Sequence, residues 1–110
     1  MKRRLEREAQ MHMQVVWGRI LPGRWSAFEV AYREAIARRG EVRGLKDQWL
    51  LRDQNDPDAG YSISLWESEA DMQAYWQSPG RAEGMALLQP FFSNQYTTTH
   101  CEVRMAARGT

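Results

Sequence analysis

Alternating and helical patterns of apolar residues divide the chain into strands and helices. Alternation and β-branched runs predict strands over residues 13–21, 45–52, 61–66 and 96–105, and large apolar residues at helical spacing predict a helix over 25–39. With a second helix after the third strand, the order is β-α-β-β-α-β, which is the ferredoxin-like split arrangement. We therefore predict an α+β fold in which a four-stranded antiparallel sheet carries its helices on one face.

The stretch after the third strand carries the signals of a helix start and a helix end. Ser68 is followed three residues later by Asp71, which is the pattern of a capping box. Ser78-Pro79-Gly80 is expected to break this second helix, and a further short helix is expected between residue 82 and Pro90. The chain thus turns from strand to helix with Trp66 at the corner.

Both faces of the predicted sheet carry large side chains. In the third strand, Tyr61, Ile63 and Leu65 share one face, and Ser62, Ser64 and Trp66 share the other. Only one face can be covered by the helices of the same chain. Because a large apolar patch is rarely left in water, we expect a second copy of the chain to cover the other face and form a homodimer.

The composition indicates one ordinary globular domain. The 110 residues suffice for a single two-layer core, and the net charge of +1 gives no electrostatic argument for binding nucleic acid or a membrane surface. No apolar run is long enough to span a membrane. The single cysteine, Cys101, excludes an internal disulfide and fits a reducing cytoplasm.

The domain is predicted to occupy residues 13–105, between two short ends. Residues 1–12 are expected to form a flexible arm, with a helix that docks on a partner subunit as the alternative. Residues 106–110 are expected to be a tail.

Candidate binding residues gather around Trp66. Ser62 and Ser64 would leave room and offer hydrogen bonds beside its indole, which suits a flat aromatic ligand. The alternative, weighted equally, is that the serines merely meet small helix residues while Trp66 fills a corner. Met72 and Tyr75 lie on the helix stripe that would roof such a pocket, although a methionine at this spacing is more typical of plain core.

Few residues are candidates for catalysis. His100 in the last strand could take a proton from a phenol, but a solvent-facing histidine is the commoner case. Cys101 cannot pair with it, because adjacent strand residues point to opposite faces. With two histidines, one cysteine and no clustered carboxylates, no metal site is expected. Four arginines, Arg33, Arg38, Arg39 and Arg43, are interpreted as the solvated end of the first helix.

Four short motifs follow one another along the chain: Pro22-Gly23-x-Trp25-x-x-Phe28, Gly44-Leu45, Leu50-Leu51-Arg52-Asp53 and Leu65-Trp66-Glu67-Ser68-Glu69. In this order and spacing they resemble the antibiotic biosynthesis monooxygenase domain, and the resemblance covers residues 13–104. It implies a dimeric α+β barrel: a homodimer with its sheets face to face and a small-molecule pocket between each sheet and its own helices.

The resemblance also implies a function. The expected activity is that of a cofactor-independent monooxygenase, which oxidises a small aromatic, phenolic or quinone-like molecule with dioxygen and uses no flavin or metal. The haem-degrading relatives carry three residues whose positions fall on Gly18, Tyr75 and Met85, and none of the three matches, so no haem is expected. Because fold does not fix function, a non-catalytic ligand-binding or sensor dimer remains the alternative.

Overall fold

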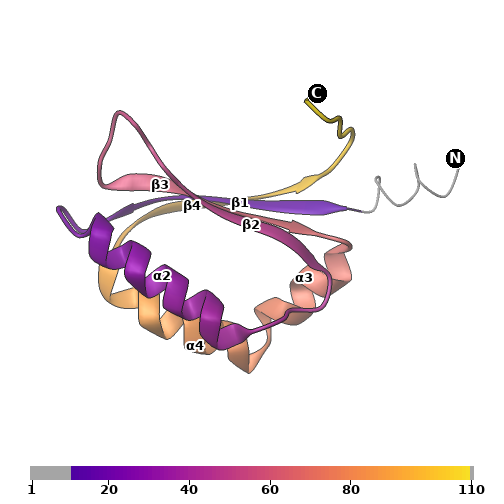
Figure 1. The fold of residues 1–110 in the computed structure, drawn as a ribbon, viewed down its shortest axis with the longest axis horizontal. Coiled ribbons are helices and arrows are strands. Elements are labelled where there is room, and N and C mark those ends of the chain that lie inside the picture. Colours follow the sequence, from indigo (N-terminus) through magenta and orange to yellow (C-terminus); the bar gives the residue numbers. More distant parts are fainter. Residues whose placement is uncertain (1–10, 110) are drawn as a thin grey trace, which may run out of the picture.

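A computed structural model describes residues 11–109 of the chain (Figure 1). Its elements are β1 (His12–Ile20), α2 (Trp25–Arg39), β2 (Leu45–Arg52), β3 (Ala59–Trp66), α3 (Glu69–Trp76), α4 (Pro79–Leu88), the 3-10 turn η1 (Gln89–Phe91) and β4 (Phe92–Glu102). No helix in this part of the chain is long and apolar enough to cross a membrane.

The four strands form one antiparallel sheet in the order β2-β3-β1-β4. Val15 pairs with Ile63 on β3 and with Thr99 on β4, which fixes the register of the two central strands and one edge. All three helices lie on one face of this sheet (Figure 1). The predicted ferredoxin-like α+β fold is therefore confirmed.

The core lies between the sheet and the first half of α2. Ile20, Trp25, Phe28 and Tyr32 form its buried cluster, and the rings of Trp25 and Phe28 are 5.4 Å apart between centroids. This packing fixes one end of α2 against the sheet. A cavity borders α2 along the same side, from Trp25 to Arg39.

Helix α4 begins earlier than the sequence pattern predicts. Ser78-Pro79-Gly80 ends α3, as expected, but it also starts α4: the Ser78 hydroxyl accepts from the Arg81 backbone N–H, and Pro79 occupies the first turn. Proline is tolerated there because the first helical N–H groups have no intrahelical partner anyway. Only Gln77 and Ser78 therefore separate the two helices.

The ends of the domain also differ slightly from the prediction. β4 starts at Phe92 rather than at Tyr96, and it ends at Glu102 rather than at Met105. The predicted arm of residues 1–12 lies outside the described residues except for Met11 and His12, and His12 already belongs to β1. No regular structure follows Glu102 up to residue 109.

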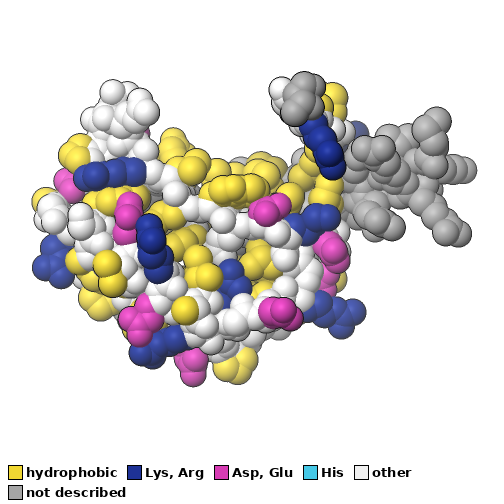
Figure 2. Space-filling model, viewed as in Figure 1, with side chains coloured by type: hydrophobic (Ala, Val, Ile, Leu, Met, Phe, Trp, Pro, Cys, Tyr) yellow, Lys and Arg dark blue, Asp and Glu magenta, His cyan; other side chains and the backbone are white. Residues whose placement is uncertain are grey.

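No helix within residues 11–109 covers the second face of the sheet (Figure 1), which we call the bare face. Trp49 and Leu51 lie on it with 42% and 44% of their surfaces exposed. Hydrophobic side chains line this upper side of the molecule in the space-filling view (Figure 2). A single chain thus leaves an apolar surface in contact with solvent.

Candidate functional site

A cavity of about 870 Å³ lies between the sheet and the helices. That volume falls within the ~300–1,000 Å³ typical of small-molecule sites. Its apolar walls come from all the main elements and include Val16, Phe28, Ile36, Leu50, Trp66, Trp76 and Met85. Phe92 and Tyr96 of β4 line it too but are exposed, so the cavity opens beneath this edge strand.

Four of the five predicted binding residues line the cavity: Ser62, Ser64, Trp66 and Tyr75. The Trp66 indole N–H donates to the Ser64 hydroxyl over 2.9 Å, and its ring lies 5.5 Å from the ring of Tyr75. Trp66 is only 2% exposed, so it both packs the corner and forms a wall. Trp66 therefore combines the two roles considered for it, the wall of a pocket and the filler of the strand–helix corner.

Met72, the fifth, is placed elsewhere. It is 1% exposed and is not among the residues that line the cavity. Its position on the inner side of α3 directs it into close-packed core, as its residue type suggests. A binding role for Met72 therefore has no support from the cavity.

His100 lies on the helix-facing side of β4 but outside the cavity lining. The side chains of Tyr96 and Thr98, with the same parity in the strand, do line the cavity. His100 is exposed and stands edge-on to the ring of Trp76, 5.0 Å between centroids. The candidate base is thus separated from the cavity by an indole.

A chain of hydrogen bonds links α2, β2 and β3 beside the cavity. Arg39 donates to the Gln48 side-chain oxygen over 2.8 Å, and the Gln48 amide nitrogen donates to the Tyr32 hydroxyl over 2.7 Å. The Tyr32 and Ser62 hydroxyls are 2.8 Å apart. We call these four residues the Arg39 relay.

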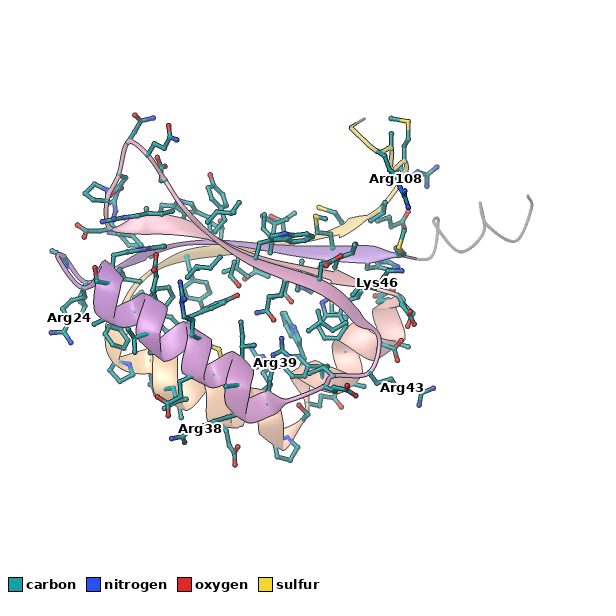
Figure 3. All side chains as sticks on the ribbon, viewed as in Figure 1. Arg24, Arg38, Arg39, Arg43, Lys46 and Arg108 are labelled. Carbon is teal, nitrogen blue, oxygen red and sulfur yellow. The ribbon has the colours of Figure 1, made fainter. Side chains whose placement is uncertain are left out.

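The interpretation of Arg39 as part of a solvated helix end is wrong. Arg38 does point outward and pairs with Glu34 over 2.8 Å, whereas Arg39 lies on the side of α2 that faces the sheet (Figure 3). The difference follows from helical geometry, because Arg39 is two turns beyond the buried Tyr32 and shares its face.

The cavity lining is cationic. Of the residues that the structure describes, Arg19, Arg39 and Arg81 line the cavity, and no aspartate, glutamate or histidine does. Arg19 is neutralised by an ion pair with Asp56, and the Arg81 guanidinium lies 4.9 Å above the Trp76 ring. The uncompensated positive charge therefore comes from α2 and α4.

Burial raises the pKa of the Tyr75 phenol, and the nearby Arg39 and Arg81 charges oppose that shift only in part. Tyr75 thus stays protonated at neutral pH and can donate a hydrogen bond. It is not suited to act as a base. Among residues 11–109, no three His, Cys, Asp or Glu side chains come together as metal ligands.

The sequence patterns did not identify Gln14 or Gln48, and they placed Trp76 and Tyr32 on the apolar faces of their helices without assigning either to the site. One signal was available: Gln14 and Gln48 both pair with Ser64 in the sheet, so polar residues of matching parity meet across three strands. The Trp76 indole donates to the Gln14 side-chain oxygen over 2.9 Å. Recognising that these polar side chains lie together required the strand register, which alternation alone does not fix.

Solved structures share this fold at low sequence identity. A point mutant of SnoaB, a cofactor-independent oxygenase from Streptomyces nogalater, is 15% identical with a TM-score of 0.77, over 89% of this chain and 97% of that chain. A conserved protein from Methanosarcina mazei Go1 is 13% identical with a TM-score of 0.77, over 88% and 96%. The Nitrosomonas europaea protein NE2512, of unknown function, is 17% identical with a TM-score of 0.74, over 94% and 98%.

A search of curated proteins finds no match to the chain. The model of one protein family, described as antibiotic biosynthesis monooxygenase, matches residues 11–87. This match spans β1 through almost all of α4 and includes most elements that build the cavity. The chain belongs to the antibiotic biosynthesis monooxygenase family.

Proposed function

We propose that this protein is a cofactor-independent monooxygenase that oxidises a flat phenolic aromatic to a quinone in the cavity between sheet and helices. The observation that carries the proposal is the cavity itself: an aromatic wall formed by Trp66 stands directly beside hydrogen-bonding groups on β3. The fold shared with SnoaB, a cofactor-independent oxygenase, supports the same reaction class.

The reaction needs only the substrate and dioxygen. The ionised phenol passes one electron to dioxygen, and the two radicals combine at the ring carbon opposite the phenol oxygen to give a peroxide anion. This anion takes a proton from water and becomes a hydroperoxide, which replaces the proton lost when the phenol ionised. Loss of water then breaks the O–O bond, and the former C–H hydrogen leaves with it. One oxygen atom becomes the new carbonyl and the other becomes water, so no further reductant is consumed.

The residues of the cavity would contribute binding, orientation and exclusion of water. The rings of Trp66 and Tyr75 lie 5.5 Å apart at 36° to each other and would contact the faces and edges of a planar ligand. Tyr75, kept neutral by burial, would donate to a substrate oxygen. Since His100 lies outside the lining, it is not assigned the role of base, and the substrate would enter already ionised.

A second candidate function, a non-catalytic ligand-binding dimer, is favoured by one observation. Within the described part of the chain, no carboxylate or imidazole that could act as a general base lines the cavity. Such a protein would bind the same aromatic molecules without consuming oxygen. Oxygen uptake separates the two functions.

The test uses anthrone, a flat phenol tautomer, in an oxygen electrode. We expect the wild-type protein to accelerate uptake of one dioxygen per anthrone and to place one labelled oxygen atom from ¹⁸O₂ in the anthraquinone product. Trp66→Ala should slow the reaction at least tenfold, about 1.4 kcal/mol in transition-state stabilisation. Trp66→Phe, which keeps an aromatic wall, should retain more activity than Trp66→Ala. Circular dichroism checks that both variants are folded.

Two outcomes would reject the enzymatic proposal. Anthrone that binds without any acceleration over buffer would identify a binding protein. Anthrone that neither binds nor reacts, together with failure of related hydroxyanthraquinones to bind, would mean that the cavity is not a site for flat phenols.

We also propose that a second copy of the chain covers the bare face. The exposure of Trp49 and Leu51 there supports this arrangement, because apolar surface of this kind is usually buried against a partner. A homodimer with facing sheets would leave both cavities accessible from the helix side.

A further inference from the structure

Among residues 11–109, three glycines line the cavity: Gly18, Gly60 and Gly84. Gly18 and Gly60 lie inside strands and pair with each other across β1 and β3, the two central strands of the sheet. A glycine inside a strand weakens it, because glycine loses more conformational freedom on folding than other residues and has no side chain to pack. Such a position usually reflects a special backbone conformation, a close neighbour or a ligand.

Gly60 and Gly84 are explained by their neighbours within the chain. A β-carbon at Gly60 would overlap the Leu51 carbonyl oxygen and the ring of Trp25, so no larger residue fits there. A β-carbon at Gly84 would lie 3.6 Å from that of Ala35, where α4 packs against α2. Both glycines thus serve packing inside the chain.

Gly18 has neither a special backbone nor a close neighbour. Its φ lies outside the positive range that three other glycines adopt. The pairing of β1 with β4 shifts after residue 19, but the unusual backbone there belongs to Asn94, with a φ of 70°. Within 4 Å, a β-carbon at Gly18 would meet two atoms of the described chain, the Gln95 carbonyl oxygen at 3.7 Å and the Tyr96 β-carbon at 3.8 Å. Both are ordinary contacts, so the cavity has open space over Gly18.

This open space lies far from the aromatic wall. Gly18 shares the cavity side of β1 with Gln14, which pairs with Ser64 of β3. Because a strand rises ~3.3 Å per residue, Gly18 lies about 13 Å along the sheet from the level of Ser64, to which the Trp66 indole donates. A single aromatic ring in contact with Ser64 and Trp66 is too short to reach Gly18. Three fused rings in line span most of the distance.

We propose that Gly18 is a specificity-determining residue: the space over it receives the far ring of a multi-ring ligand whose oxygen-bearing ring lies against Ser64 and Trp66. A glycine inside a strand is suited to this role, because it lets a ligand approach the backbone closely. This inference rests on the proposed function and adds to it the length of ligand that the site accepts. A larger side chain at position 18 would shorten the cavity and favour ligands with fewer rings.

The test compares a long and a short probe in the absence of oxygen, so that neither is oxidised. 2-Hydroxyanthraquinone has three fused rings in line, and 2-naphthol has two. In isothermal titration calorimetry, we expect Gly18→Val to weaken binding of 2-hydroxyanthraquinone by about tenfold or more and to change the affinity for 2-naphthol by less than about threefold. Gly18→Ala, which adds a single methyl group, should have a smaller effect in the same direction.

Thermal unfolding separates a ligand space from a structural glycine. Because alanine and valine lose less conformational freedom on folding than glycine does, Gly18→Ala and Gly18→Val should melt at or above the wild-type temperature. Gly60→Ala is the matched control from the paired position. It should melt well below the wild-type protein, because its β-carbon would overlap Leu51 and Trp25.

The other outcomes reject the inference. If both Gly18 variants melt well below the wild-type protein, the glycine is structural. Stable variants that bind both probes with wild-type affinity would show that the space is not used, whereas oxidation of anthrone by the wild-type protein would still support the proposed function. Equal weakening of both probes would mean that position 18 controls entry to the cavity and not ligand length. If the wild-type protein binds neither probe nor anthrone, the proposed function fails and the inference fails with it.

Discussion

Tyr75 illustrates how the surroundings decide what one side chain can do. It lies on α3 with its ring next to Trp66, and burial raises the pKa of its phenol although two arginines act in the opposite direction. A tyrosine beside cations in a cavity could be taken for a base. Because desolvation is the larger effect, the structure makes it a neutral donor instead.

A stability measurement at alkaline pH checks this assignment. A phenol whose pKa is raised on folding stabilises the folded state below its unfolded-state pKa, near 10.0, and this contribution is lost as the pH rises toward the folded-state pKa. We therefore expect the free energy of unfolding to fall more steeply above pH 10 in the wild-type protein than in Tyr75→Phe. Urea unfolding at a series of pH values measures both slopes.

Tyr96→Phe is the control, because Tyr96 is an exposed tyrosine at the mouth of the cavity. It should reproduce the wild-type slope. Equal slopes in wild type and Tyr75→Phe would show that burial does not favour the neutral phenol.

At the scale of single residues, strand parity predicted which side chains of β3 face the cavity. Alternation placed Ser62, Ser64 and Trp66 on one side of β3, and all three line the cavity. It could not reveal Gln48, because β2 shifts register between Leu45 and Asp47 and the partners across a sheet are set by tertiary structure. Arg39 was misassigned because a charged residue at a helix end usually faces water.

Among the elements, the turn before β2 fixes where α3 begins. Gly44 has a φ of 81°, and its carbonyl accepts from the Glu67 N–H over 2.7 Å at the end of β3. A β-carbon at this position would overlap the Asp71 side chain. Asp71 in turn binds the capping Ser68 hydroxyl over 2.9 Å, so the turn and the helix start are one packed unit.

Two glycine substitutions separate backbone strain from this overlap. Gly23 has a φ of 75° but open space around a β-carbon. Gly23→Ala should destabilise the fold by about 1–2 kcal/mol through the left-handed conformation alone. Gly44→Ala carries the same strain and a clash in addition, so we expect a further loss of about 1–3 kcal/mol in urea unfolding. Equal losses in the two variants would contradict the packed arrangement of Gly44 and Asp71.

The element order, the helix over 25–39 and the strand over 45–52 were predicted from periodicity, and the structure confirms them. The start of α4 was not, because Ser-Pro-Gly signals a chain break equally well as a helix start. Only the arrangement of the Ser78 hydroxyl, which caps the new helix, distinguishes the two. Local patterns thus identify elements better than their boundaries.

For the whole molecule, the two faces of the sheet have different roles in this account. One face is covered by the helices and encloses the cavity, and the bare face displays apolar side chains (Figures 1 and 2). The proposed homodimer would bury the bare face.

Analytical ultracentrifugation tests the dimer. We expect a mass of about 26 kDa, twice the 12.9 kDa of one chain, for the wild-type protein at micromolar concentration. Leu51→Glu, which puts a charge on the bare face, should shift the mass toward that of the monomer. Val30→Glu should not, because Val30 is 66% exposed on α2, away from that face. A wild-type monomer that stays in solution at this concentration would be incompatible with the proposal.

Binding of flat phenols between the sheet and the helices can be followed through the side-chain N–H signals of the five tryptophans. Trp66 and Trp76 line the cavity, whereas Trp49 lies on the bare face. In a ¹H–¹⁵N correlation spectrum recorded during titration with 2-hydroxyanthraquinone, we expect the indole signals of Trp66 and Trp76 to shift while that of Trp49 stays in place. A shift of the Trp49 signal with no change in Trp66 and Trp76 would show that phenols bind to the bare face and not in the cavity.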